Sequence, residues 1–336
     1  MPLKLSYKIS PINDTIFRIS LPLPGYPPYI NVYLFKGEVN TLFDTGIFWT
    51  WRLLRRALHD LGLQFSDIHQ VIPSHGHVDH YGAAYAIAKR NKHVEVITHI
   101  ADAKRIEEGL YNKPSIMLKF IESMGVPKPL IVPLAFLDLT FKSMGHPVIV
   151  TRKITDDQCS LQVGNYNATL ILTPGHSKGA MCLYIEKEGF LFSGDHIVPG
   201  VKPIILAGFE PNTSFPVAQS HTIFHTSLKK IEKLSPQYIF PAHGEPFQEK
   251  LNRLIVKYQK VYQFRKKRMY NLLLNNDYTV YGLARQVFKN LKGINLVLDL
   301  YLSLSETYTH LEAMCEEGDV IKYNFDNTYY YTATLL

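Results

Sequence analysis

The segment SHGHVDH, residues 74–80, decides which fold and which chemistry we expect of this chain. It places three histidines and one aspartate within six positions, namely His75, His77, Asp79 and His80. If these residue types were scattered at their overall frequencies, the pattern would arise with a chance of about one in a thousand. Imidazole and carboxylate are the ligands that borderline divalent ions such as zinc prefer. The segment therefore predicts a metal site in a tight loop.

Three later turns carry further ligand-type side chains, and each turn follows a predicted strand. His176 ends the segment TPGH, Asp195 lies in SGDH, and His243 lies in PAHGEP. With the four residues of the first segment they make seven, which exceeds the four ligands of a structural zinc site. Seven ligands suit two ions that share one carboxylate and keep open positions for water.

The residues around the first segment predict a strand, a ligand loop and a helix. Residues 29–46 alternate and are rich in β-branched and aromatic side chains, which predicts two strands ending in a loop that presents Asp44. Helical spacing of apolar residues follows, and then a short strand leads into the histidines. The residues directly after the cluster, 81–91, again favour a helix.

The middle of the chain alternates between helical and strand patterns. Residues 101–146 predict a helical insertion with broken periodicity. The strand rhythm returns within 168–176 and 180–196, and a helix at 224–235 precedes a last strand that leads to His243.

The pattern changes after Pro246. We expect three helices and a closing hairpin that turns at Asp326-Asn327. The three predicted helices and the hairpin cover residues 248–274, 279–290, 294–318 and 319–333. Three helices followed by a two-stranded wing form a winged-helix module. The sequence thus predicts a catalytic domain over 1–247 and a winged-helix-like domain over 248–336.

The motifs in their order resemble those of the metallo-β-lactamase superfamily. Asp44-Thr-Gly comes first, the H-x-H-x-D-H segment follows, and His176, Asp195 and His243 come after it, within residues 15–247. The resemblance implies an α/β fold, a four-layer αββα sandwich with the metals at one edge of its two sheets. It also implies the ligand sets: His75, His77 and His176 for a first metal, Asp79, His80 and His243 for a second, and Asp195 as a bridge.

The expected reaction is hydrolysis without a serine or cysteine nucleophile. Two divalent ions roughly 3.5 to 4 Å apart bring the pKa of a shared water towards 7, which supplies a bridging hydroxide. The ions also stabilise the developing oxyanion. Asp79 and Asp195 are the expected catalytic residues, with Asp79 orienting the nucleophile. Asp44 is expected behind the ligands, where it would fix an imidazole tautomer.

The leading hypothesis is a binuclear hydrolase that acts on a small thioester, ester or lactone. Zinc is the expected metal, with iron or manganese as alternatives. Four residues are candidates for the substrate pocket: Tyr81, His196, His221 and His225. Residues 101–146 and 197–225 are rich in apolar side chains and are expected to build the pocket walls.

Two other functions stay open on the sequence alone. The C-terminal region resembles the winged-helix appendage of lactamase-beta-2-like hydrolases, a branch with glyoxalase-II-like members and an endoribonuclease, so a metal-dependent nuclease is the first alternative. An iron-bound redox protein on the same scaffold is the second. Against the nuclease, residues 294–321 contain no Lys or Arg and six acidic residues, which phosphates would repel. The eight basic residues of 250–268 favour a solvated helix face over a phosphate-binding track.

Composition limits the location and the partners. The chain has 336 residues, 46% of them apolar, and a net charge of +7. The first thirty residues lack a signal-peptide pattern, and no stretch of eighteen residues is apolar and uncharged. Three widely spaced cysteines suit a reducing compartment. We expect a cytoplasmic protein with a small-molecule substrate and no membrane partner; formation of a homodimer stays open.

Overall fold

The computed structural model describes residues 6–25, 27–109, 114–199, 221–248, 251–288 and 296–334. The chain forms two compact units, each built from three segments. The first unit comprises residues 1–110, 141–203 and 227–251, and the second comprises 111–140, 204–226 and 252–336.

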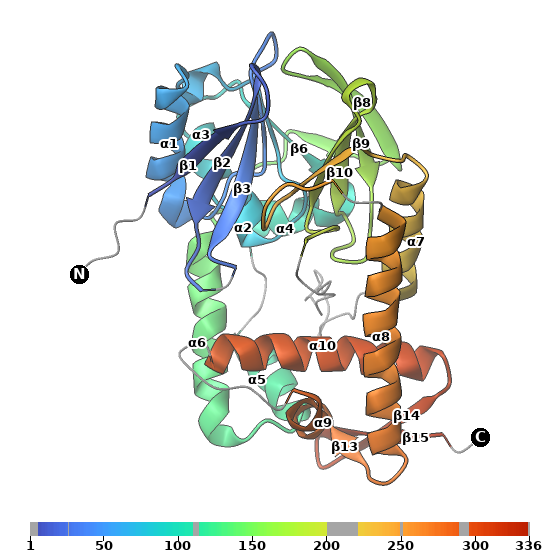
Figure 1. Cartoon of the computed structure of the whole chain (residues 1–336). Coiled ribbons are helices and arrows are strands. Elements are labelled where there is room, and N and C mark those ends of the chain that lie inside the picture. Colours follow the sequence, from blue (N-terminus) through green and yellow to red (C-terminus); the bar gives the residue numbers. More distant parts are fainter. Residues whose placement is uncertain are drawn as a thin grey trace. The chain divides into compact units, whose positions relative to one another are not determined.

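The larger sheet of the first unit has seven strands in chain order (Figure 1): β1 (Lys8–Pro11), β2 (Ile16–Pro22), β3 (Tyr29–Phe35), β4 (Thr41–Phe43), β5 (Gln70–Ile72), β6 (Glu95–His99) and β7 (Arg152–Ile154). The first four strands pair antiparallel, whereas β4 to β7 pair parallel. Parallel neighbours end at the same edge of a sheet. The loops after β4, β5 and β6 therefore emerge together.

The smaller sheet of the first unit has five strands: β8 (Gln158–Val163), β9 (Tyr166–Leu172), β10 (Met181–Ile185), β11 (Phe190–Gly194) and β12 (Tyr238–Pro241). Strands β8 to β11 pair antiparallel in sequence, and β12 joins β11 in parallel. As a result β9, β11 and β12 run in one direction, and the loops that follow them leave from one edge.

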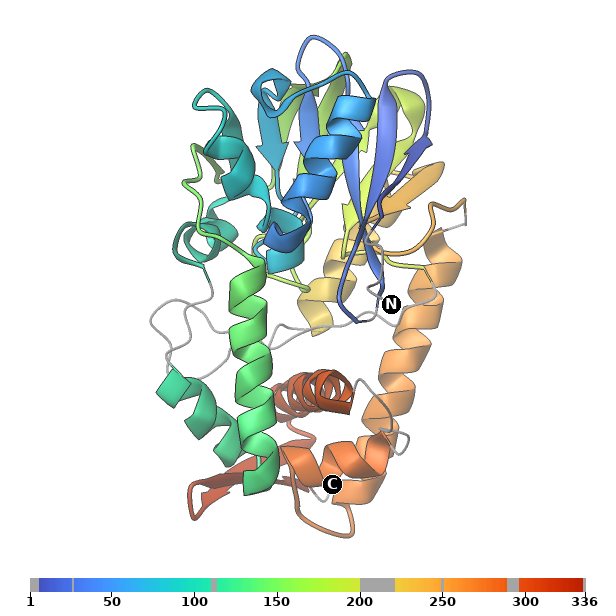
Figure 2. The ribbon, with the colours of Figure 1, turned by 90° about the vertical axis from the view of Figure 1, so that its left-hand side faces the viewer.

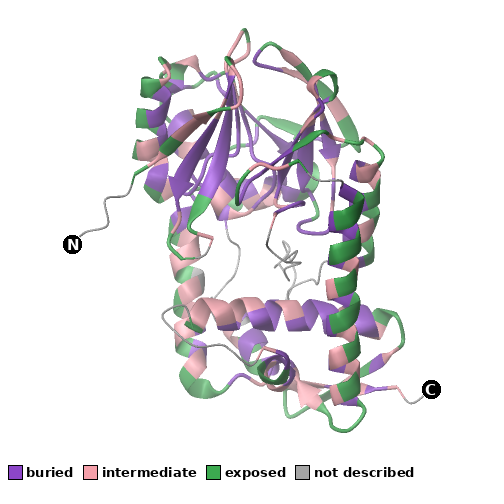
Figure 3. Ribbon diagram, viewed as in Figure 1, coloured by how far each residue is buried: buried purple, intermediate pink, exposed green. Residues whose placement is uncertain are grey.

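The two sheets pack face to face, and β3 is buried along nearly its whole length (Figure 3). Tyr33 and Phe35 belong to the core between the sheets, whereas Ile30, Val32 and Leu34 belong to the core on the other side of the strand. Successive side chains of a strand point to opposite faces, so β3 is buried on both. Aromatic rings fill the layer between the sheets; the Tyr33 and Phe192 centroids lie 4.9 Å apart.

Helices cover the outer faces of both sheets (Figures 1 and 2). On the larger sheet lie α1 (Trp51–Asp60), α2 (Val78–Tyr81), α3 (Ala84–Ala88) and α4 (Ile100–Glu108), whose apolar residues join the core below the sheet. On the smaller sheet, the second half of α7 (His221–Glu232) is anchored by Ser227 Oγ, which donates to the Pro174 carbonyl at 2.8 Å. Helix, sheet, sheet and helix form four layers, which confirms the predicted αββα sandwich.

The second unit has a core of its own, with Met269, Leu283, Leu311, Met314 and Tyr331 fully buried. Its elements are α5 (Pro114–Ser123), α6 (Lys128–Met144, of which the last four residues belong to the first unit), α8 (Leu251–Leu273), β13 (Tyr278–Thr279), α9 (Val280–Val287), α10 (Leu296–Glu316), β14 (Val320–Phe325) and β15 (Thr328–Ala333). The strands form a sheet in the order β13-β15-β14.

The three C-terminal helices and the hairpin predicted from the sequence are confirmed. Phe325 pairs with Thr328 across the turn, and Asp326 and Asn327 both have positive φ angles, 47° and 58°. A two-residue turn of this kind matches the twist of the flanking strands. The winged-helix assignment and the domain division at 247 stay predictions. The second unit also takes in residues 111–140, which the sequence prediction had included in the catalytic domain.

None of the helices within the described residues combines the length and the apolar character needed to cross a membrane.

Candidate metal centre

Five segments carry Asp44 and the predicted metal ligands, and each segment follows a strand of the first unit. Asp44 follows β4, and the segment 74–80 follows β5. His176, Asp195 and His243 follow β9, β11 and β12. The strand directions described above explain why side chains so distant in sequence meet at one edge of the sandwich.

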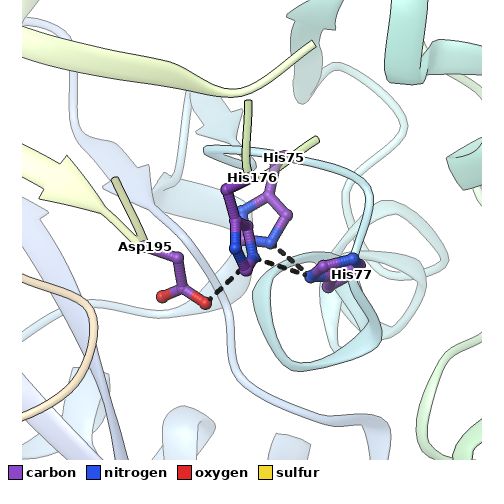
Figure 4. Close-up of side chains that lie close together, drawn as sticks. All are labelled: His75, His77, His176 and Asp195. Carbon is purple, nitrogen blue, oxygen red and sulfur yellow. Dashed lines mark hydrogen bonds and ion pairs between the residues drawn. The ribbon is translucent and has the colours of Figure 1, made fainter. Parts of the chain in front are cut away.

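A first group of side chains consists of His75, His77, His176 and Asp195 (Figure 4). His75 Nε2 lies 2.7 Å from His77 Nδ1, and His176 Nε2 lies 3.1 Å from the same atom. One nitrogen or oxygen of each member lies within 4.8 Å of those of the others. The imidazole nitrogens thus face a common point.

Asp79, His80 and His243 form a second group by the same measure. His243 Nε2 lies 3.3 Å from Asp79 Oδ2, and His80 Nε2 lies 3.6 Å from it. Here a carboxylate and two imidazoles converge.

The Asp195 carboxylate touches both groups. Its Oδ2 lies 3.3 Å from His176 Nε2 and 3.5 Å from His80 Nε2, and its Oδ1 lies 3.4 Å from His243 Nε2. A carboxylate between two sets of imidazoles has the geometry needed of a shared ligand.

Hydrogen bonds on the far side of two imidazoles fix their orientation. Asp44 Oδ2 lies 2.9 Å from His80 Nδ1, and His243 Nδ1 lies 3.0 Å from the carbonyl of Tyr29. Only a protonated Nδ1 can donate to these oxygens, which leaves Nε2 of the neutral ring with a lone pair directed at the carboxylates. Asp44 is fully buried, with a left-handed φ of 63°, and its Oδ1 also accepts from the Ser74 amide at 2.7 Å.

The two sheets approach each other closely beneath the site. Gly194 precedes Asp195 and has a φ of 53°; a Cβ there would lie 2.8 Å from the Ser74 side chain. The Ser74 hydroxyl in turn lies 3.0 Å from His75 Nδ1 and 3.1 Å from His80 Nδ1. Glycine is therefore required at position 194, because a larger residue would displace the group that contacts two ligands.

The carboxylates of the site favour a proton on His80 and on His243, and a bound metal ion would take the place of that proton. Burial lowers the pKa of His80, but the carboxylates of Asp44, Asp79 and Asp195 outweigh burial and raise this pKa well above 6.5. Burial likewise opposes the raised pKa of His243, which the same Asp195 and Asp79 bring to about 9.

His75 and His77, two imidazoles of the first group, have lowered pKa values instead. Burial lowers the pKa of His75 well below 6.5, and the neighbouring His80 and His77 lower it further. Burial is also the main reason why the pKa of His77 lies well below 6.5. These rings are neutral near pH 7, which is the state that binds a metal.

Two buried polar atoms indicate whether a metal ion fits between the side chains of the site. His80 Nε2 and Asp195 Oδ1 are inaccessible to solvent and have no hydrogen-bond partner among the described residues. A buried polar atom without a partner is costly unless it coordinates an ion. Nitrogen and carboxylate donors in this number suit zinc, iron or manganese. The residues present therefore fit a metal.

The four candidates for the substrate pocket lie in different surroundings. Tyr81 is fully buried in the core of the first unit, and burial raises the pKa of its hydroxyl to about 12. His196 is buried next to Asp195, and its amide donates to the Ser193 carbonyl. His221 and His225 belong to the second unit, where their rings lie 4.2 Å and 5.8 Å from that of Tyr262. Their role in a pocket stays a prediction.

His221 is part of a buried cluster whose charge state bears on stability. Its ring lies 4.4 Å from that of His310, and His310 Nδ1 donates to the Glu306 carbonyl at 2.9 Å. Burial, helped by the charge of Arg265, lowers the pKa of His310 to about 3. In the unfolded chain this pKa is about 6.5.

We expect the cluster to make the protein sensitive to acid. Because the folded pKa of His310 is depressed, the unfolded state binds more protons, and stability is lost as the pH falls from about 6.5 towards 3. At pH 5 the loss is about 2 kcal/mol. Urea denaturation at pH 7.5, 6 and 5 measures the free energy of unfolding. Between pH 7.5 and pH 5 this free energy should fall less in His310→Gln than in the original chain. Parallel losses in the two proteins would contradict the assignment.

The structure also shows site residues that the sequence did not suggest. Asp102 follows β6 and contacts two ligand loops, and Asn31 donates to the carbonyls of Pro241 and Gly244 on either side of His243. Only one feature of the sequence points to Asp102: it follows β6, as His75 follows β5, and these two strands are parallel neighbours. Nothing in the sequence links Asn31 to the site, because its partners beside His243 are backbone carbonyls more than 200 positions away.

Comparison with known proteins agrees with this geometry. The model of the family described as the metallo-beta-lactamase superfamily matches residues 25–243. A Bacillus subtilis (strain 168) protein named probable metallo-hydrolase YqjP is 25% identical over 327 residues, 95% of this chain and 98% of the relative. The human protein named acyl-coenzyme A thioesterase MBLAC2 is 25% identical over 204 residues, 58% of this chain and 67% of the relative.

A solved structure extends the likeness to the fold. A metallo-beta-lactamase family protein from Thermus thermophilus superposes with a TM-score of 0.81 at 21% identity, over 96% of this chain and 100% of that one. Together with the family match, the fold confirms the resemblance read from the motifs. The chain belongs to the metallo-beta-lactamase superfamily and is a metal-dependent hydrolase.

Proposed function

We propose that the protein is a binuclear hydrolase that cleaves a small thioester, with esters and lactones as further substrates of the same chemistry. The observation that carries this proposal is the Asp195 carboxylate, which lies between two groups of ligand-type side chains and contacts both. His75, His77 and His176 would hold one ion, and Asp79, His80 and His243 the other. Zinc is the first candidate for both.

Bound ions of this kind polarise a carbonyl and make a water nucleophilic near pH 7. The side chains of the protein would orient the water and the metal ligands. Asp79 is one-quarter exposed, and the His80 and His243 imidazoles keep its pKa well below 3.8 against the effect of burial. An ionised Asp79 can orient the attacking water by accepting a hydrogen bond from it. Asp44 and the Tyr29 carbonyl hold His80 and His243 in the ligating tautomer.

A thioester is favoured among the acyl substrates for two reasons. A thiolate leaves without a proton more readily than an alkoxide, so the reaction does not require a strong general acid at the site. The human relative, 25% identical over 58% of this chain, is named as an acyl-coenzyme A thioesterase. Both reasons support the class of bond rather than a particular acyl chain.

Cleavage of nucleic acid is less well supported by the charges of the second unit. Two residues of the basic run on α8 pair with acidic residues of the same unit. Arg265 forms an ion pair with Glu306, and Lys266 lies 2.7 Å from Asp319. Four basic residues of this run are exposed: Arg253, Lys257, Lys260 and Lys267. An exposed, one-sided set of this size is typical of a solvated helix face.

Several parts of the proposal extend the sequence prediction. Part of the predicted pocket wall, residues 200–220, lies outside the described residues. The apolar pocket, a cytoplasmic location and a homodimer remain expectations. Metal identity belongs to the same proposal, and elemental analysis with a visible spectrum distinguishes zinc from an iron-bound redox protein.

A substrate panel tests the proposal. Metal-loaded protein should hydrolyse thioesters faster than lactones, esters, bis-p-nitrophenyl phosphate or single-stranded RNA, because its ligands activate water against a carbonyl with a good leaving group. Release of free thiol, measured with a thiol reagent, reports the first reaction, and gel electrophoresis reports the last. Cleavage of the phosphodiesters alone would refute the proposal in favour of a nuclease.

A further inference from the structure

We propose that Asp102 is a positioning residue that ties together the two loops carrying His75, His77 and His176 and so builds the first ion site. This inference rests on the metal centre of the proposed function, because it assigns these histidines to one ion. It adds a residue that no ligand motif contains.

The Asp102 carboxylate accepts three hydrogen bonds from two different loops. Its Oδ2 accepts from the Gly76 amide at 2.8 Å and from Ser177 Oγ at 2.7 Å. Its Oδ1 accepts from the Gly179 amide at 2.9 Å. Gly76 lies between His75 and His77, and Ser177 directly follows His176, so one side chain bonds to residues adjacent to all three ligands.

The environment of Asp102 fits a bracing role. Asp102 lies in the first turn of α4, directly after β6, and only 4% of it is exposed. A Cβ at Gly179 would lie 2.8 Å from Asp102 Cγ, so the second loop approaches the carboxylate as closely as glycine allows. Three donors thus surround the buried carboxylate.

The chemistry requires a carboxylate at this position. All three partners are donors, and an ionised carboxylate only accepts. An asparagine has the same shape, but its NH2 group would face at least one of these donors. Asp102→Asn therefore breaks one connection and leaves the side chain in place, which makes it the sharpest variant. Ser177→Ala removes one of the three bonds and should show a smaller effect in the same direction.

Cobalt binding to the metal-free protein gives the first test. Co2+ is titrated against a competing chelator, with its visible absorption as the signal, in the original chain, Asp102→Asn, Ser177→Ala and Glu107→Gln. Glu107 is the matched control, since it lies on the same helix and bonds to Lys153 at 2.9 Å and not to a ligand loop. His77→Ala and His243→Ala supply reference spectra for loss of the first and of the second ion.

We expect Asp102→Asn to lower the affinity for one cobalt ion about 10- to 100-fold and to leave the affinity for the other unchanged. At low cobalt its spectrum should match that of His77→Ala, and Glu107→Gln should behave as the original chain. An equal loss of affinity for both ions would indicate a general loss of structure and would overturn the inference. Unchanged affinity for both ions would overturn it as well.

Hydrogen exchange supplies a second measurement that needs no metal. In the metal-free protein, at least one of the peptides covering 74–82 and 173–181 should exchange faster in Asp102→Asn than in Glu107→Gln, because the single oxygen of asparagine can accept from only one of the Gly76 and Gly179 amides. Unchanged exchange in both peptides would contradict the tie between the loops.

The inference and the proposed function fail in different ways. If the original chain binds two cobalt ions and cleaves no thioester, the substrate proposal fails and the role of Asp102 stands. If it cleaves thioesters while Asp102→Asn keeps both ions, the role of Asp102 fails alone. An original chain that binds no cobalt overturns both.

Discussion

Replacing Asp195 by asparagine is expected to lower kcat/KM for a thioester by a factor on the order of 10³. Asparagine preserves the volume of the side chain and removes the negative charge that lies between His176, His80 and His243. Without that charge the two ions would repel each other unscreened, so we also expect fewer than two ions per chain. Steady-state kinetics and elemental analysis of the same preparation measure both effects.

Asp157→Asn is a suitable control for this variant. Asp157 is exposed, pairs with Lys230 at 3.3 Å and belongs to neither group of ligand-type side chains, so the substitution removes the same charge outside the site. It should leave both kcat/KM and metal content unchanged. If Asp195→Asn retained two ions and full activity, a bridging role for this carboxylate would be excluded.

Replacing Asp44 by asparagine should lower metal affinity and activity by roughly 10- to 100-fold. The new side chain would still accept from the Ser74 amide, but its NH2 group would then face His80 Nδ1. His80 would have to accept on Nδ1 and carry its proton on Nε2, the nitrogen that faces the carboxylates. The ring would stay in place and lose its ligating lone pair.

The backbone offers a matched control for Asp44→Asn. Asp44 and Asp326 both have a left-handed φ, 63° and 47°, and asparagine tolerates that conformation well. Asp326→Asn, in the exposed hairpin turn, therefore repeats the substitution without touching an imidazole. Equal behaviour of the two variants in metal titration would show that the Asp44 contact with His80 does not matter for binding.

The ligand loops could be predicted because short-range patterns determine them. The H-x-H-x-D-H segment and the turns at His176, Asp195 and His243 each follow a strand that alternation or apolar runs reveal. The motif order then resembled one superfamily, and that resemblance supplied the sandwich and the grouping of ligands. Spacing alone could not say which histidines share an ion.

Long-range contacts account for what the sequence did not reveal. Most bonds that Asp102 and Asn31 make beside the ligands are to backbone amides and carbonyls, which every residue type carries, so the sequence does not reveal them. The second unit likewise draws residues 111–140 into a core with the C-terminal helices, and Phe120 packs on Tyr308 with ring centroids 5.3 Å apart. A break in helical periodicity indicates an insertion but does not indicate the partner of its apolar face.

The central claim is that seven side chains hold a pair of ions around Asp195, and anomalous diffraction tests it most directly. Crystals of zinc-loaded protein, measured on both sides of the zinc absorption edge, should show two peaks roughly 3.5 to 4 Å apart. One peak should lie among His75, His77 and His176, and the other among Asp79, His80 and His243. A single peak, or peaks away from Asp195, would contradict the account.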